Sequence, residues 1–359
     1  MVAVKPTARI AALDAARALG VAAMVAGHTL DALLTPALRA HPAVVAYWKA
    51  RGFTAPVFIA VAGWAVAAAI QRSGAQGWAI PAGRARRVGV LLAIGLFLHW
   101  PGWGIEALRA GDPVVFAHLV SFNVLHTIAA SIAVTALLFA ALPARRARLL
   151  ALAAGAVLAV SLGMRAPGEP TTLAGIALEQ ALGGSSPFPL FPWMAYFFAG
   201  AAVGLLVTEA GRREVAWLAG LGAAAVGATC WTGVGTMPFN DPILVVYRIG
   251  AFLLLIAVLT RVPASVAARL APLGRASLGV YALHVPLVYG WSTHPGLAAR
   301  IGPTLGPAQA LLVAAAVLVA SLAAQTALSA LWRWARRAAA SGGASLSGGE
   351  GQGEGAGGG

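Results

Sequence analysis

Long apolar runs alternate with short basic segments along almost the whole chain. An apolar run of about 17 to 25 residues can cross the hydrocarbon core of a bilayer as a helix. The sequence predicts such spans near residues 10–34, 53–71, 85–100, 119–141, 148–164, 188–208, 214–232, 243–260, 272–291 and 308–332. This pattern predicts an all-α fold, a polytopic membrane helix bundle of about ten transmembrane helices.

The composition also indicates a membrane environment. Of the 359 residues, 60% are hydrophobic and only 10% are charged, whereas about 25% are charged in an average soluble protein. The 25 Lys and Arg exceed the 11 Asp and Glu, which in a soluble protein would suggest nucleic-acid binding. Here the basic residues lie in short clusters between apolar runs, so they indicate membrane topology, and we expect no nucleic-acid partner. The single cysteine, Cys230, excludes an internal disulfide and a cysteine-based metal site.

The distribution of basic residues predicts the sidedness of the bundle. Most of them fall in the loops on the same side as the N-terminus, and cytoplasmic loops carry an excess of Lys and Arg. Both termini are therefore expected in the cytoplasm. Residues 1–340 are expected to form one transmembrane domain. The Gly-rich residues 341–359 are expected to form a disordered tail, because such a sequence cannot bury a core.

The first span carries charged groups where each is costly. The stretch LDAARALGVAAMVAGHTLDALL, residues 13–34, contains Asp14, Arg17, His28 and Asp31. Arg17 and His28 are eleven residues apart, which leaves only about 20° of rotation and roughly 16 Å of rise, so both lie on one stripe. Asp31, one turn beyond His28, can orient or charge-stabilise the imidazole. The alternative is a buried polar seam that only holds the first helix against its neighbours.

A second polar stripe is predicted on the ninth span. Ser277, Tyr281 and His284 follow the spacing i, i+4, i+7 and share one helix face, and Arg275 begins the stripe at the inner boundary. These side chains are candidates for substrate binding and catalysis. Equally, Ser277 and Tyr281 could hydrogen-bond between helices and His284 could be a satisfied core histidine.

Asn123 and His126 lie one turn apart at the outer start of the fourth span, at a depth compatible with His28. His126 is a candidate for catalysis or acceptor orientation, and its alternative is a structural hydrogen bond. Three histidines at similar depth could bind a metal. However, no carboxylate or His-x-x-x-His pair accompanies them, so we expect no metal.

Several further side chains suit a substrate cavity. Arg86 and Arg87 follow a cytoplasmic loop, where they serve topology or, as bidentate donors, bind the phosphates of a nucleotide-bearing donor. Arg248 lies one to two turns inside the eighth span, and either snorkels to the outer surface or enters the cavity. Trp193 falls near a predicted outer helix end, where an indole is favoured.

Four stretches resemble one family of membrane enzymes. The arginine, ten intervening residues and histidine of the first span match the signature of membrane acyltransferase family 3. The first span resembles more closely the heparan-α-glucosaminide N-acetyltransferase-like bacterial membrane proteins. FNVLHTIAASI (122–132), PFPLFPWMAYFFAG (187–200) and LGRASLGVYALHVPL (273–287) are similar to later motifs of that family.

This resemblance implies an acyltransferase that uses acetyl-CoA or another acyl-CoA. The cytoplasmic donor would place its phosphates among the cytoplasmic arginines. The acceptor would be an amine or hydroxyl of an extracytoplasmic glycan or glycolipid, and the protein a multi-pass component of a bacterial cell membrane. The expected catalytic residues are His28, Asp31, His126 and His284. Arg17, Arg86, Arg87, Arg275, Ser277 and Tyr281 are expected to bind the donor, and Asn123, Trp193 and Arg248 the acceptor.

Two questions stay open at this level. His28 could act as a general base on the attacking group, or carry the acyl group on its imidazole. A bundle with buried charge is also what a transporter needs, and a non-catalytic relative of the family would share the same pattern. Against a transporter, the sequence contains no repeated halves.

Overall fold

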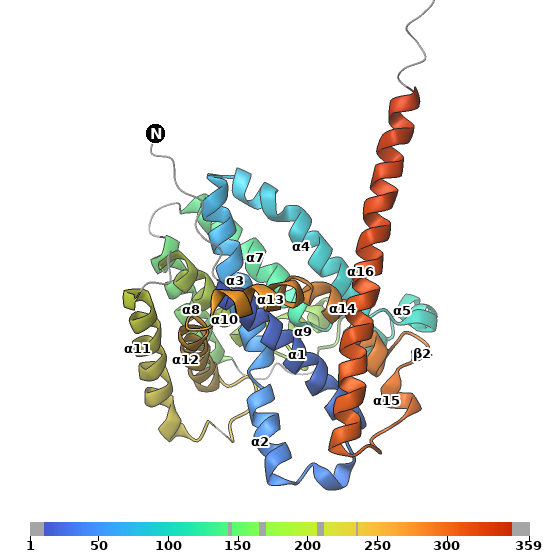
Figure 1. Ribbon diagram of the computed structural model, residues 1–359, viewed down its shortest axis with the longest axis horizontal. Helices are drawn as coiled ribbons and strands as arrows, with labels where there is room; N and C mark the ends of the chain where they lie inside the picture. Colours follow the sequence, from blue (N-terminus) through green and yellow to red (C-terminus); the bar gives the residue numbers. More distant parts are fainter. Residues whose placement is uncertain (1–10, 143–145, 165–169, 207–211, 235, 347–359) are drawn as a thin grey trace, which may run out of the picture.

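The computed structural model describes residues 11–142, 146–164, 170–206, 212–234 and 236–346 (Figure 1). Its helices are α1 (Ala11–Leu33), α2 (Pro42–Arg51), α3 (Thr54–Ser73), α4 (Ala79–Leu98), α5 (Ile105–Arg109), α6 (Pro113–Val120), α7 (Val124–Ala141), α8 (Arg146–Gly163), α9 (Leu173–Leu182), α10 (Leu190–Leu206), α11 (Arg212–Thr229), α12 (Pro242–Leu259), α13 (Ala264–Arg275), α14 (Ser277–Tyr289), α15 (Leu297–Arg300) and α16 (Pro307–Leu346). Two short strands, β1 (Gly290–Trp291) and β2 (His294–Pro295), pair in antiparallel fashion after α14. The prediction of an all-α fold is thus confirmed apart from this one small hairpin.

Each predicted span coincides with a helix, but two of them are divided. The segment predicted over 119–141 contains the end of α6 and all of α7, because the side chain of Asn123 accepts hydrogen bonds from the backbone N–H groups of Leu125 and His126 and begins a new helix there. The segment predicted over 272–291 is divided at Ala276, between α13 and α14. The second division places Arg275 at a helix end and not within a continuous span.

Six candidate membrane spans are present among the described residues, so the protein is an integral membrane protein. They are Pro42–Ser73, Val124–Ala141, Arg146–Gly163, Arg213–Thr232, Pro242–Leu259 and Pro307–Arg337. Helices α10 and α14 are apolar but shorter. The total of ten spans and the cytoplasmic side of both termini stay predictions.

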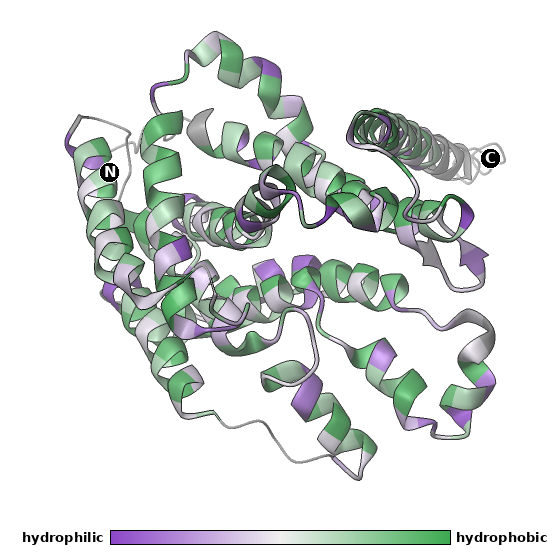
Figure 2. Ribbon diagram, turned by 90° about the horizontal axis from the view of Figure 1, so that it is seen from below, coloured by the Kyte–Doolittle hydropathy of each residue, from purple (hydrophilic) through white to green (hydrophobic). Residues whose placement is uncertain are grey.

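Hydrophobic residues occur along most of the helices, as the hydropathy colouring of the ribbon in Figure 2 shows, and many large ones are exposed. Leu152, Trp217 and Leu312 are among the exposed large side chains. An apolar surface of this extent is unusual on a soluble monomer and is what lipid contact requires. The surface therefore agrees with the composition.

Helix α1 runs through the middle of the molecule and contacts α3, α12, α13, α14 and α16 (Figure 1). Beside it, α3 and α10 pack backbone against backbone. A Cβ atom at Gly63 would collide with the carbonyl oxygen of Phe197, and one at Gly200 with that of Ala60. Small residues at helix contacts allow this close approach in membrane proteins. The tight pair forms a rigid wall behind α1.

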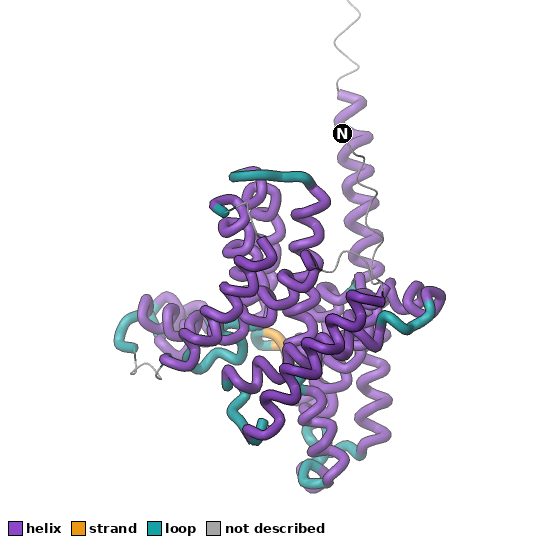
Figure 3. Tube along the Cα trace, turned by 90° about the vertical axis from the view of Figure 1, so that its left-hand side faces the viewer, coloured by secondary structure: helices purple, strands orange, loops and turns teal. Residues whose placement is uncertain are grey.

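Helix α16 is longer than the bundle is thick, and its C-terminal half stands clear of the other helices (Figures 1 and 3). It continues to Leu346, six residues beyond residue 340, where we expected the domain to end. Residues 347–359 of the expected tail lie outside the described residues. The part of α16 that packs on α1 and α14 is the part that lies next to the site.

Candidate active site

A cavity of about 860 Å³ lies beside the central helix α1. Arg17, Met24, His28 and Asp31 of α1 line it, at the spacings of a single helix face. Helices α3, α4, α7, α13, α14 and α16 provide most of the remaining wall. The stripe predicted on the first span thus faces an interior cavity.

Three arginines from separate segments contribute to the lining of this cavity. They are Arg17 of α1, Arg87 of α4 and Arg275 at the end of α13. Arg17 also approaches Asp14, with 3.8 Å between its Nη1 atom and the Oδ1 atom of the buried carboxylate. Arg86 and Arg87 are both exposed, but only Arg87 is among the lining residues. The structure therefore separates these two neighbouring arginines, which the sequence analysis treated together.

Two histidines that are 256 residues apart in the sequence meet beside the cavity, where His28 lines the wall and His284 lies buried behind it, outside the lining. The Nε2 atom of His284 lies 3.1 Å from the Nδ1 atom of His28, and the two ring centroids are 5.1 Å apart. His284 is completely buried, and its Nδ1 atom lies 2.7 Å from the carbonyl oxygen of Val280. A carbonyl oxygen only accepts, so Nδ1 of His284 carries a proton. When His284 is neutral, its Nε2 atom therefore accepts a hydrogen bond from Nδ1–H of His28.

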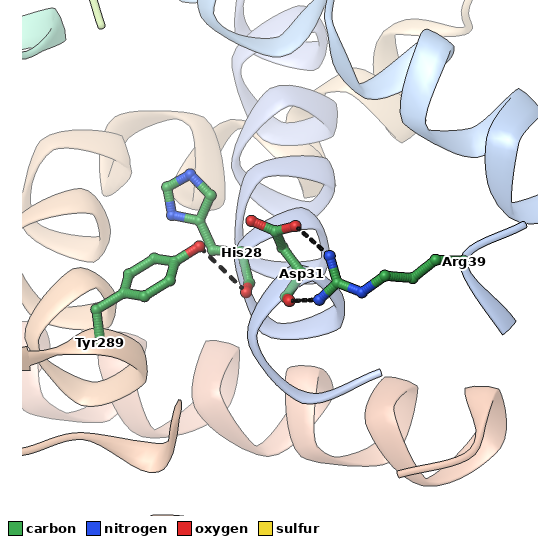
Figure 4. A network of polar contacts seen from close by, with 4 residues as sticks. All are labelled: His28, Asp31, Arg39 and Tyr289. Atoms are coloured by element: carbon green, nitrogen blue, oxygen red, sulfur yellow. Dashed lines mark hydrogen bonds and ion pairs between the residues drawn. The ribbon is translucent and has the colours of Figure 1, made fainter. Parts of the chain in front are cut away.

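The same tautomer argument determines which nitrogen of His28 is basic. A neutral imidazole has one N–H donor and one acceptor. Because Nδ1 of His28 donates to His284, the lone pair of His28 is on Nε2. Helix α14 also holds the backbone at this point, since the hydroxyl of Tyr289 donates to the carbonyl oxygen of His28 at 3.4 Å (Figure 4). The ring of His28 thus has a defined orientation and a defined tautomer.

Asp31 lines the same cavity, but its carboxylate has a partner that the sequence analysis did not select. The Nη1 atom of Arg39 lies 3.6 Å from Oδ1 of Asp31, and Nη2 of Arg39 donates to the backbone oxygen of Asp31 (Figure 4). A short 3-10 turn, Pro36–Leu38, follows α1 and brings Arg39 back to that helix. No helical spacing links the two residues, so periodicity gave no signal for this pair. The role of Asp31 in orienting His28 stays a prediction.

Of the stripe predicted on α14, Ser277 and Tyr281 line the cavity. The ring of Tyr281 lies 5.8 Å from that of His284. These two side chains therefore extend the polar wall from Arg275 toward the histidine pair, as their spacing predicts.

Asn123 and His126 do not line the cavity, although the neighbouring Val124 and Leu125 do. They form a capping box, in which Asn123 Oδ1 accepts from the backbone N–H of His126 and Nδ1 of His126 accepts from the backbone N–H of Asn123 at 3.3 Å. The Nδ2 group of Asn123 also donates to the carbonyl oxygen of Gly95. Both side chains are buried in contacts that stabilise the start of α7.

Trp193 and Arg248 are also outside the lining, but both hold a residue that belongs to it. Arg248 is buried rather than snorkelling: its Nη1 group donates to the carbonyl oxygen of Phe239 at 3.1 Å, and its guanidinium lies 4.4 Å from the centre of the Phe239 ring. Trp193 packs on that ring and donates to Asn240. Phe239 itself lines the cavity. Trp193 and Arg248, which were predicted to bind the acceptor, therefore contact a lining residue but do not line the cavity themselves.

Several lining residues were not selected from the sequence, among them Trp48, Phe239, Gln325 and Ser329. Trp48 lies on the short helix α2, and Phe239 lies in the connection before α12, where no periodic signal marks it. Gln325 and Ser329 lie on α16, where the i, i+4, i+8 spacing of Ser321, Gln325 and Ser329 is a signal that could have found them. Among the described residues, no group of three or more His, Cys, Asp or Glu is arranged to hold a metal ion.

The fold and the site define an integral membrane helix bundle with a charged internal cavity. Residues 9–240 match the family described as heparan-alpha-glucosaminide N-acetyltransferase, catalytic, and the chain belongs to this family. The resemblance seen in the first span and in residues 122–132 and 187–200 is thereby confirmed. The family is an N-acetyltransferase catalytic domain that uses acetyl-CoA. No curated protein matches the chain.

The matched residues end before α12, so the C-terminal helices α12 to α16 lie beyond them. The likeness of residues 273–287 to a family motif stays a prediction. His284, Arg275 and Gln325 belong to this unmatched part, yet they contribute to the same site as His28.

Proposed function

We propose that this protein transfers an acetyl group from cytoplasmic acetyl-CoA to an amine or hydroxyl of an extracytoplasmic glycan or glycolipid. The observation that carries the proposal is that His28, held by the buried His284, lines a cavity that arginines also line. A histidine with a fixed tautomer supplies a base, and arginines supply phosphate ligands. A polar stripe that only joined helices, or a helix that faced lipid, would need neither a histidine of fixed tautomer nor arginines beside a cavity.

The donor would bind through its phosphates to Arg17, Arg87 and Arg275. Guanidinium groups bind phosphate oxygens in bidentate fashion and keep their charge inside a partly buried site. Ser277 and Tyr281 follow Arg275 along α14 toward His284. The acyl end of the donor would thus be directed along this wall to the histidine pair.

In the direct route, the acceptor nitrogen or oxygen attacks the thioester carbonyl carbon while Nε2 of His28 takes the proton that the nitrogen or oxygen loses. The carbon–sulfur bond then breaks. The CoA thiolate leaves and recovers the proton from Nε2 of His28. His284 accepts from Nδ1–H of His28 throughout, which stabilises the imidazolium that forms.

In the covalent route, Nε2 of His28 itself attacks the thioester carbon and displaces the CoA thiolate. The acceptor then attacks the acyl-imidazole, and its proton passes to the released histidine nitrogen. Both routes use the same nitrogen and the same tautomer. They differ in whether the protein carries the label before an acceptor is present.

The acceptor would enter on the side of Asp31, Trp48 and Phe239. Aromatic rings bury the apolar faces of a sugar, and the Asp31–Arg39 pair offers charged groups at the same end. Trp193 and Arg248 act here through Phe239, whose position they hold.

Purified full-length protein in lipid nanodiscs with acetyl-labelled acetyl-CoA tests this proposal. An acetyltransferase releases free CoA thiol when a glycan amine is added, and a covalent route also labels the protein in its absence. A transporter or a non-catalytic relative cleaves no thioester. Absence of thiol release across a panel of amino and hydroxyl glycans, together with absence of CoA binding, would overturn the proposal.

A further inference from the structure

The long C-terminal helix contributes a buried amide to the cavity. The Oε1 atom of Gln325 is buried without a hydrogen-bond partner among the described residues. Gln325 and Ser329, one turn apart on α16, both line the cavity that contains His28. A buried amide oxygen without a partner is unfavourable, so a donor in the cavity would stabilise it once the side chain turns its amide toward the cavity.

The position of this amide along the cavity follows from its contact with α14. A Cβ atom at Gly279 would lie 2.6 Å from the Cδ atom of Gln325, so only glycine leaves room for the amide here. Gly279 is four residues after Arg275 and five before His284. At a rise of 1.5 Å per residue along α14, the amide therefore lies roughly 7.5 Å before the histidine, between it and Arg275 at the end of α13.

We propose that Gln325 binds the pantetheine arm of the donor by accepting a hydrogen bond from one of its two amide N–H groups. This inference rests on the proposed function. The phosphates would lie at Arg275 and the thioester at His28 and His284. The pantetheine arm between them must therefore pass Gly279, which lies between these positions in α14. An amide oxygen at this position favours donors that contain pantetheine over simple thioesters, which lack the amide N–H groups. Because α16 lies outside the residues matched by the family, the contact is a feature of this chain's C-terminal helix.

The variant Gln325→Leu removes the amide and keeps the approximate volume of the side chain. We expect it to raise the KM for acetyl-CoA about threefold to tenfold, the usual effect of losing one hydrogen bond, with kcat unchanged. Thr326→Val is the matched control, since Thr326 is exposed, donates to the carbonyl oxygen of Leu322 and does not line the cavity. Thermal unfolding in nanodiscs measures whether either variant is destabilised.

Analogues of the donor test the same hydrogen bond by removing its N–H group instead of its acceptor. Two analogues of acetyl-CoA, each with one pantetheine amide replaced by an ester, lack the corresponding N–H donor. The native protein is expected to lose affinity for one of them by the same factor as Gln325→Leu loses for acetyl-CoA. Gln325→Leu should lose nothing further with that analogue, because the bond is already absent.

The outcomes separate this inference from the function on which it rests. If the native protein neither binds CoA nor cleaves acetyl-CoA, the proposed function fails. If it does both, but Gln325→Leu has the native KM and neither ester analogue weakens binding, the pantetheine contact alone is overturned. Should Gln325→Leu fold poorly, Gln325→Met and the analogues on the native protein provide the same measurement.

Discussion

Two histidine regions of this protein have similar sequence features and different structures. His28 and His126 each lie on an apolar helix, near an acidic or amide side chain, at comparable predicted depth. His28 hydrogen-bonds to His284 across two helices and lines a large cavity. His126 uses its Nδ1 atom to cap its own helix, and its ring packs against Gly95. The partner of the Nδ1 atom and the access to the cavity therefore separate His28 from the helix-capping His126.

The largest effect is expected at His28. His28→Ala removes the base or acyl carrier, so we expect kcat to fall about 10²- to 10⁴-fold while the unfolding temperature changes little. Thiol release and thermal unfolding of the same preparation measure the two quantities. If the unfolding temperature of His28→Ala falls and activity falls in proportion to the folded fraction, His28 is a structural residue like His126.

His284 is expected to have the next largest effect, because it acts through His28. His284→Ala removes the acceptor for Nδ1–H of His28 and frees the ring to adopt the other tautomer. We expect kcat to fall about 10- to 100-fold with an unchanged KM for acetyl-CoA, a smaller loss than at His28 because the base itself remains. His284→Gln, which offers an amide oxygen, should recover part of the loss. If His284→Ala raises KM as much as it lowers kcat, and His284→Gln restores neither, His284 has only a packing role.

The adjacent arginines of α4 give an internal test of the cavity. Arg87→Gln removes a lining guanidinium, so we expect the KM for acetyl-CoA to rise about tenfold, the range for a hydrogen bond to a charged group. Arg86→Gln is the matched change one residue away, outside the lining, and should leave the KM within about twofold. Equal effects of the two variants would show that the field of the basic segment, and not a contact of Arg87, attracts the donor.

The smallest catalytic effect is expected at the capping box. Asn123→Ala leaves the first N–H groups of α7 without their side-chain acceptor, which costs about 0.5–2 kcal/mol of stability. Turnover per folded molecule should stay near the native value, since Asn123 does not line the cavity. Chemical unfolding and thiol release measure this pair of outcomes. A selective loss of kcat without loss of stability would return Asn123 and His126 to the catalytic group.

The periodic part of the site could be predicted from the sequence. Arg17, His28 and Asp31 on one stripe, and Ser277 and Tyr281 on another, all line the cavity because helix geometry converts spacing into direction. The membrane class and the helical fold also follow from local composition, since a helix satisfies its own backbone hydrogen bonds within lipid. These properties need no knowledge of which helices are neighbours.

Contacts between distant segments required the tertiary structure. The pairing of His28 with His284, the return of Arg39 to Asp31 and the insertion of Gln325 opposite Gly279 each join residues with no shared periodicity. Their partners depend on how helices pack and on where the chain turns. Likewise, nothing in the spacing of Asn123 and His126 separates a helix cap from a substrate ligand. Sequence therefore determined which side chains lie on each helix face, and packing decided which of those faces surround the cavity.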